Sequence, residues 1–203
     1  MKKLALVLAL ILALAVMLVS CAKDDAEAPE NNNEVVDNVN NNETPDVPET
    51  PDVPEASTSV LSAEELQAAV DKIYEKYPVP FMAGTIPAEM ITADYYAYYT
   101  GLADDSKVNA VIVSESMIGS QAYSLVLLSV KDGEDAEAVA TEMINGINQR
   151  KWMCVEADLI RTVVSGNTVM LVMIDSEMQI GIDGFVDAFV EAVGEVTFEA
   201  TKN

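Results

Sequence analysis

The chain is poor in the residues that most enzymes use for chemistry. Its 203 residues include no histidine and only two cysteines. Ser–His and Cys–His nucleophile pairs, imidazole metal ligands and the usual general base near neutral pH are therefore excluded. The S-x-x-K spacing of one class of serine nucleophile is missing from residues 61–203 as well. We expect a protein that is not an enzyme and that holds no metal ion or cofactor.

One kind of enzyme stays open, because carboxylates are abundant. Glycoside cleavage needs two carboxyl groups at a suitable separation, and Glu115, Asp158 and Asp175 lie near the ends of expected strands. With 23 acidic residues between positions 61 and 203, such placements also arise by chance. We therefore assign no catalytic residue.

Basic residues are also scarce. The chain has 11 Lys and Arg residues against 34 Asp and Glu residues, which gives a formal net charge of −23 at pH 7. Binding to nucleic acid requires clustered Lys and Arg to displace counterions from phosphates, so nucleic acid is excluded as a partner. The same charge repels anionic lipid headgroups. We expect a domain held away from a membrane surface rather than lying on it.

The N-terminus carries the pattern of a secretory signal. Lys2 and Lys3 precede an apolar run over 4–19, and the run ends at the letters LVSC, 18–21. This ending resembles the lipobox of bacterial lipoproteins. The resemblance implies removal of residues 1–20, a diacylglyceryl group on the Cys21 sulfur and an acyl chain such as palmitate on the new amino terminus. The protein would then sit on the extracytoplasmic face of the cell membrane, anchored by lipid.

The apolar run over 4–19 has two other interpretations. It could be a transmembrane helix or a signal peptide that is removed without lipidation. A membrane span needs roughly 20 apolar residues, and Ser20 ends the run too early. A signal without lipidation would accept any small residue in place of Cys21. Both interpretations are therefore less favoured than the lipoprotein.

Residues 21–60 have the composition of a linker rather than of a domain. They contain NNNEVVDNVNNNE and the near-repeat PDVPET and PDVPEA, with eleven acidic residues and a single lysine. Low hydrophobicity, like charges and regular prolines cannot offset the entropy of ordering. We expect a lipidated Cys21 followed by a disordered, acidic, Pro- and Asn-rich linker.

Residues 61–203 are predicted to form a single α+β domain. Apolar residues recur at helical spacing in four segments and at strand spacing in four others. Strand, strand, helix occurs twice, which predicts a four-stranded, mainly antiparallel sheet with the two later helices on one face, plus an N-terminal helix. Ser62 and Glu65 form a capping-box signature, and Asp132 is the expected cap of the third helix. The predicted helices cover 62–77, 93–100, 136–147 and 182–193, and the predicted strands cover 108–115, 122–130, 159–164 and 168–174.

The strand over 168–174 is apolar on both faces. Two helices cover only one face of a sheet, so the other face requires a cover of its own. The N-terminal helices are the favoured cover. A second copy of the protein, which would make a homodimer, and a bound ligand are the alternatives.

Several segments together resemble a known group of proteins. They are LSAEELQAAVDKIY, ITADYYAYYTGL, LVLLSVKDGEDAEAVATEMINGINQR and GNTVMLVMID, behind the lipobox and the acidic linker. In this combination the chain is similar to an uncharacterised lipoprotein family of Gram-positive bacteria (Firmicutes) that carries a domain of unknown function. The likeness covers most of 62–193. The resemblance implies a cellular location but no activity, and it assigns no site residue.

Clustered aromatic residues are the main candidates for contact with a ligand or partner. They are Tyr95, Tyr96, Tyr98, Tyr99 and Trp152. Aromatic rings stack on sugars and peptides, but Tyr95, Tyr98 and Tyr99 also share one helical face, as in a helix that packs on a sheet. Packing is the favoured interpretation for the tyrosines and for Trp152.

The sulfur-containing residues are predicted to be structural. Once Cys21 is acylated, Cys154 has no partner for an intrachain disulfide. Its neighbours Met153 and Val155 are apolar, so we expect a buried thiol. Met143, Met170 and Met173 fall on core faces and are expected to fill gaps rather than to bind metal.

The sequence therefore predicts a lipid-anchored extracytoplasmic lipoprotein. Its domain is expected to be a non-catalytic module that contacts an unidentified envelope protein or polymer, with the membrane reached through the lipid at Cys21. The alternative is a binding module for a small apolar or carbohydrate ligand.

Overall fold

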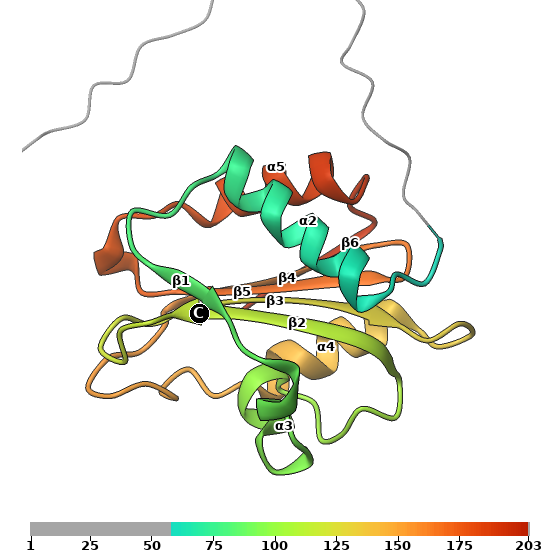
Figure 1. Cartoon of the computed structure of the whole chain (residues 1–203), viewed down its shortest axis with the longest axis horizontal. Helices are drawn as coiled ribbons and strands as arrows, with labels where there is room; N and C mark the ends of the chain where they lie inside the picture. The colour runs from blue at the N-terminus through green and yellow to red at the C-terminus, as the bar shows by residue number, and fades with distance from the viewer. Residues whose placement is uncertain (1–57, 203) are drawn as a thin grey trace, which may run out of the picture. The chain divides into compact units, whose positions relative to one another are not determined.

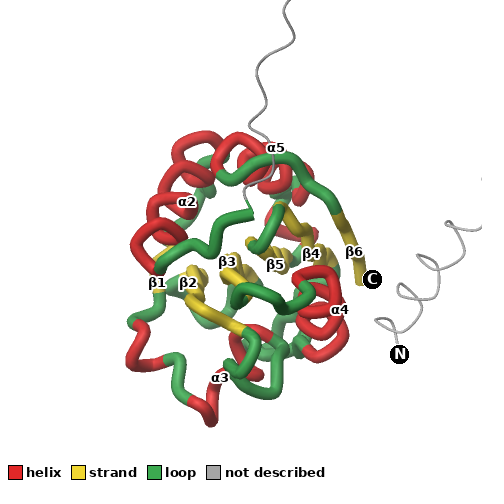
Figure 2. Tube along the Cα trace, turned by 90° about the vertical axis from the view of Figure 1, so that its right-hand side faces the viewer, coloured by secondary structure: helices red, strands yellow, loops and turns green. Residues whose placement is uncertain are grey.

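The computed structural model describes residues 58–202, which form three layers. One sheet lies between two layers of helices (Figure 1), and the view turned by 90° shows helices on both sides of the strands (Figure 2). The predicted signal peptide, Cys21 and most of the predicted linker lie outside the described residues. No helix within 58–202 has the length and apolar character needed to cross a membrane.

The sheet has six strands in the order β1-β2-β3-β5-β4-β6, and all neighbours are antiparallel. The prediction of four strands is therefore wrong in number, although the four predicted strands form the centre of the sheet. The two missed strands are short and lie at the edges. The strands are β1 (Ala83–Thr85), β2 (Val108–Ser116), β3 (Tyr123–Val130), β4 (Leu159–Ser165), β5 (Thr168–Ile174) and β6 (Phe198–Lys202).

The helices cover both faces of the sheet in pairs. One core cluster joins the sheet to α3 and α4, and a second joins the other face to α2 and α5. The helices are α2 (Ala63–Lys76), α3 (Ala93–Thr100), α4 (Ala136–Gly146) and α5 (Ile182–Ala192), with short 3-10 turns η2 (Ala88–Met90) and η3 (Ser176–Met178).

The prediction that both later helices share one face is wrong. α4 packs on one face of the sheet and α5 on the other. The physical reason is that all residues of β3 and β5 are buried, so each face needs a helical cover. The N-terminal helices divide in the same way, since α2 lies beside α5 and α3 lies beside α4. Both faces are thus covered without a second copy, and the homodimer stays a prediction.

Local signals fix most helix ends. The Oε2 atom of Glu65 accepts a hydrogen bond from the Ser62 backbone N–H at 2.8 Å, and Ser62 Oγ accepts one from the Glu65 N–H at 3.3 Å, so the predicted capping box is confirmed. The cap of α4 is Asp135, not the expected Asp132: its carboxylate accepts hydrogen bonds from two backbone N–H groups of the first turn. Asp135 directly precedes the helix, which Asp132 does not.

A glycine pair sets the contact between α3 and α4. Gly101 ends α3 in the left-handed region, with a φ of 80°. A Cβ atom on Gly146 would lie 2.0 Å from the Gly101 carbonyl oxygen. The two helices meet at their C-termini only because neither residue has a side chain there.

Candidate functional site

The tyrosine-rich helix α3 is only partly buried. Tyr96 and Tyr99 are buried and Tyr98 is half-buried, but Tyr95 is 57 % exposed. Tyr95 therefore does not pack on the sheet as predicted, although its ring lies edge-on to that of Tyr98, with the centroids 6.4 Å apart. The side of the helix that enters the core carries Tyr96 and Tyr99, three residues apart, followed by Leu102.

Three of the five predicted contact residues surround a lysine of the same chain. The Nζ atom of Lys151 lies 5.1 Å from the ring centroid of Tyr98, 5.8 Å from that of Tyr99 and 5.1 Å from that of Trp152. Cation–π contacts of this kind are strongest when the cation is removed from water. The aromatic cluster thus already holds a cation, and that cation is the protein's own.

Glu115 pairs with the enclosed Lys151 ammonium. Its Oε1 atom lies 2.6 Å from Lys151 Nζ, and the two side chains are 11 % and 0 % exposed. Nζ also donates hydrogen bonds to Ser124 Oγ at 3.3 Å and to the Tyr98 carbonyl oxygen at 3.4 Å. Burial lowers the pKa of Lys151, and the charge of Glu115 acts against that lowering.

The burial of Lys151 and Ser124 limits the reactions in which these side chains could take part. Lys151 and Ser124 lie within hydrogen-bond distance, as in a Ser–Lys nucleophile pair, but neither side chain has exposed surface for a substrate to reach. The arrangement instead joins the loop over 147–158 to β2, β3 and α3. We describe it as a structural clamp.

The carboxylates considered for glycoside cleavage are held in separate interactions. Glu115 is paired with Lys151. Asp158 accepts hydrogen bonds from the Ser176 N–H at 2.7 Å and from Ser176 Oγ at 2.6 Å, and these bonds lower the pKa of Asp158. Asp175 accepts a hydrogen bond from the Glu177 N–H at 2.9 Å. No group of three or more Cys, Asp and Glu residues within 58–202 is placed to hold a metal ion.

The loop over 147–158 exposes Cys154, contrary to the prediction of a buried thiol. Cys154 lies in the left-handed region with a φ of 63°, and its neighbour Met153 is also exposed. The apolar neighbours were misleading because this segment is neither helix nor strand, so it has no periodic inner face. Beside it lies a shallow hollow of about 350 Å³, lined by Arg150, Trp152, Cys154, Val155 and Glu156.

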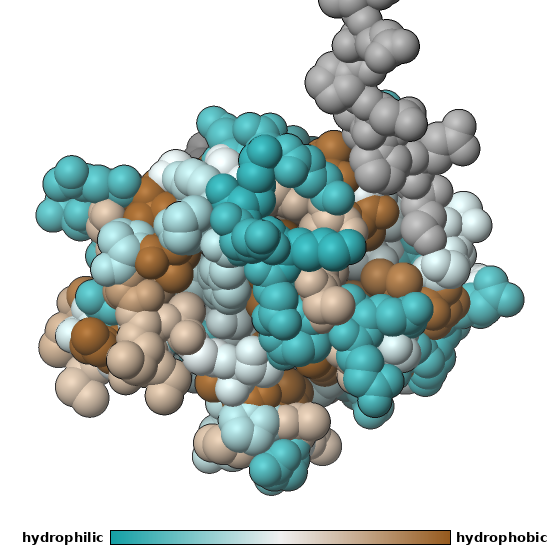
Figure 3. Space-filling view, turned by 45° about the horizontal axis from the view of Figure 1, so that its top comes forward, coloured by the Kyte–Doolittle hydropathy of each residue, from teal (hydrophilic) through white to brown (hydrophobic). Residues whose placement is uncertain are grey.

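Large apolar side chains gather at one end of the sheet. Met82, Met117, Ile118 and Met153, here called the methionine patch, are 50 to 73 % exposed. They come from three loops that are joined by backbone hydrogen bonds, Met117 N–H to Met82 O and Met153 N–H to Gly119 O. The space-filling view shows apolar side chains concentrated at its left side (Figure 3). Sequence reasoning missed this patch because its members lie far apart along the chain.

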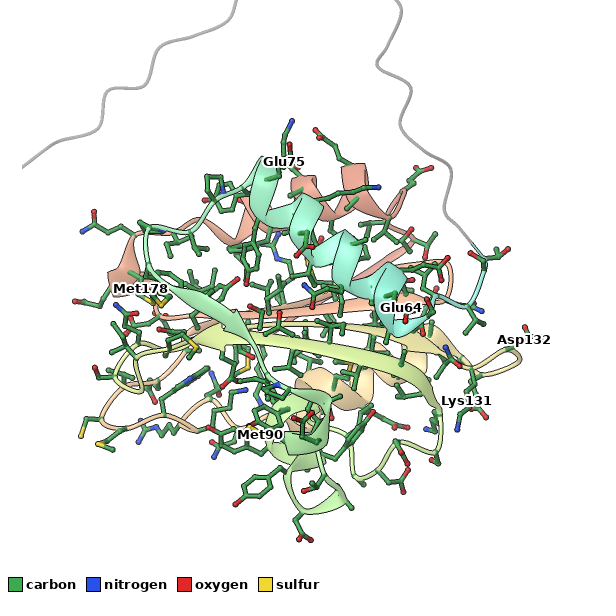
Figure 4. All side chains as sticks on the ribbon, viewed as in Figure 1. Glu64, Glu75, Met90, Lys131, Asp132 and Met178 are labelled. Carbon is green, nitrogen blue, oxygen red and sulfur yellow. The ribbon has the colours of Figure 1, made fainter. Side chains whose placement is uncertain are left out.

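The methionine patch lies at the end of the domain opposite to the first described residues. Thr58 to Leu61 run along the start of β2 and the end of β3, where the Leu61 carbonyl oxygen accepts hydrogen bonds from Asn109 and Ser129. The patch lies beyond the other ends of these strands. Figure 4 labels Glu64 and Asp132 at the first end and Met178 at the second.

Comparison of the chain with protein-family models, with curated proteins and with solved structures gives no match. The resemblance to a Firmicutes lipoprotein family therefore stays a prediction.

Proposed function

We propose that this chain is a lipid-anchored extracytoplasmic lipoprotein whose domain is a non-catalytic module that contacts another macromolecule of the cell envelope. The N-terminal pattern ending at Cys21 supports the anchor. The methionine patch supports the contact, and it is the observation on which the proposal depends.

The patch has the chemistry of a protein contact surface. Methionine is enriched at protein interfaces, and its flexible thioether adapts to irregular partner surfaces. Scattered single apolar residues are ordinary on protein surfaces, but these four lie on adjoining loops. Exposed apolar side chains gathered on loops that are hydrogen-bonded to one another support an interaction site.

The position of the patch fits an anchored protein. A chain tethered through residues before Thr58 is held at one end of the domain, and the patch lies at the other. A module held in this way presents Ile118 and its neighbours away from its attachment. This arrangement supports contact with a partner in the envelope.

The anchor is tested by subcellular fractionation. Cys21→Ala should release the protein from the membrane fraction and abolish its labelling by a palmitate analogue, because the thioether is the attachment point. Retention of the variant in membranes would contradict the lipid anchor.

The contact is tested by photo-crosslinking in the native host. A benzoylphenylalanine in place of Ile118 should give an adduct of discrete mass, and the same group in place of Asp132 at the opposite end should not. Equal adducts from both positions, or none from position 118, would contradict a contact through the patch.

A second candidate function comes from the hollow beside Trp152. An aromatic ring next to the Arg150–Glu156 ion pair provides a stacking surface and polar groups for a carbohydrate. Retention on purified peptidoglycan that is lost in Trp152→Ala and kept in Ile118→Ala would favour this alternative.

A further inference from the structure

We propose that the methionine patch binds a protein whose contact surface combines apolar side chains with lysine and arginine. The inference rests on the proposed function and adds the chemical class of the partner. It is carried by the charges that surround the patch.

Three carboxylates lie beside the patch, at the same end of the sheet. Asp175 follows β5, and its N–H donates to the carbonyl oxygen of Ala122, which directly precedes β3. Asp158 is bonded to Ser176, and the side chain of Glu177 is exposed on the next residue. The loop between Met117 and Ala122 connects the patch to these acids.

The basic side chains near these three acids have other hydrogen-bond or ion-pair partners. Arg150 pairs with Glu156, and Lys151 is buried against Glu115. Lys202 lines a hollow together with Asp158, and its Nζ atom donates a hydrogen bond to the Ile147 carbonyl oxygen. Among the ion pairs of residues 58–202, none involves Asp158, Asp175 or Glu177. Asp175 and Glu177 therefore flank the patch with negative charge that is not held in an ion pair, and this charge attracts a partner with positive charge at the rim of its contact surface.

The same charges disfavour the other occupants. A symmetric contact with a second copy would bring the three acids of one protomer against those of the other. The segment before Thr58 carries eleven acidic residues and, after Cys21, one lysine, so it is repelled as well. An anionic membrane surface is repelled for the same reason.

The test uses the full-length protein with the photo-crosslinker in place of Ile118. The test variant carries Asp175→Asn and Glu177→Lys, and the matched control carries Asp132→Asn and Glu134→Lys at the opposite end, with the same change in charge. Asparagine retains the capping acceptor of Asp175. Thermal unfolding of both variants is measured, and a cooperative transition is required of each.

We expect the adduct yield at position 118 to fall by about fivefold or more in the test variant and to stay unchanged in the control, because only the first pair adjoins the patch. Mass spectrometry of the adduct should place the crosslink in a protein segment that contains lysine or arginine beside apolar residues.

Several outcomes would overturn the inference. They are an adduct of the chain with itself, a crosslink to residues 22–57, an adduct with lipid only, and a yield that the test variant does not change. A persistent protein adduct that is insensitive to charge would leave the proposed function standing and refute this inference alone. Absence of any adduct at position 118 in the protein that carries neither pair of charge substitutions would refute both.

Discussion

Lys151 Nζ lies 2.6 Å from Glu115 Oε1, inside a cage of three aromatic rings. This pair joins the loop that carries Met153 to the strand that leads into Met117. The pair therefore fixes the position of Met153 relative to Met117, and both residues belong to the methionine patch. Removing only one member of such a buried ion pair strongly lowers the stability of the fold, because the remaining charge has no partner.

Removing the lysine alone should destabilise the domain strongly. Lys151→Met is expected to lower the free energy of unfolding by about 3–5 kcal/mol, since it leaves Glu115 buried and unpaired. The double variant Lys151→Met with Glu115→Leu should recover most of this loss. Urea denaturation followed by circular dichroism measures both. Lys72→Met, at an exposed position, is the control. A single variant as stable as this control would contradict the clamp.

Stability should fall at alkaline pH because of buried tyrosines. Burial raises the pKa of Tyr123 well above the ordinary value of 10.0. The folded state then keeps a proton that the unfolded state loses above pH 10, so stability present below that pH is lost as the pH rises further. The thermal unfolding midpoint should decline above pH 10, and less steeply in Tyr123→Phe.

The control for the alkaline experiment is Tyr95→Phe, because that side chain is exposed. It should follow the wild type. The lowered pKa of Lys151 acts in the opposite direction up to pH 10.5, but all three proteins contain this residue, so it does not affect their difference. Equal slopes for the wild type and Tyr123→Phe would refute the assignment.

The capping box of α2 should contribute measurably to stability. Ser62→Ala removes the acceptor of the Glu65 N–H and is expected to cost about 1 kcal/mol in the free energy of unfolding. Thr92→Ala is the matched variant, because Thr92 is the N-cap of α3 but its side chain makes no capping hydrogen bond. A loss for Thr92→Ala as large as that for Ser62→Ala would argue against a specific role of the box.

The contact between α3 and α4 reverses the usual effect of alanine. In an unobstructed helix, glycine to alanine is stabilising by about 1 kcal/mol. Gly146→Ala should instead destabilise by about 1–3 kcal/mol, since its Cβ would lie 2.0 Å from the Gly101 oxygen. Gly119→Ala, where no described atom lies within 4 Å of the added Cβ, should be neutral. Chemical denaturation of the two variants shows whether each substitution raises or lowers the free energy of unfolding.

Local patterns in the sequence predicted the elements that depend on local interactions. The capping box at Ser62 was predicted correctly because it lies within four residues, and the central strands because each is a short apolar segment bounded by turn residues. The edge strands β1 and β6 were missed. β1 is three residues long, and β6 forms only where β4 offers an edge, so neither has a signal independent of the fold.

Two other features could not be predicted from local patterns, for a different reason. They are the face of the sheet that each helix covers and the residues that meet in the clamp. An apolar stripe shows that α5 packs on a sheet but not which face receives it. The sequence indicated Tyr98, Tyr99 and Trp152 as contact candidates. It did not indicate the polar members of the clamp, Lys151, Glu115 and Ser124, as a group, and Glu115 was considered only as a carboxylate for glycoside cleavage. Those three come from a loop and two strands, and only the tertiary structure brings them together.

The pairing of β3 with β5 also has a consequence for how the chain reaches its native state. Tyr123 lies opposite Ile174, so the centre of the sheet joins segments separated by a helix, a long loop and another strand. Such non-local pairing makes folding slow. A nascent or translocating polypeptide that ends before Thr168 lacks the second neighbour of its most buried strand. We therefore expect the domain to become protease-resistant only when β5 and the residues that follow it have been released.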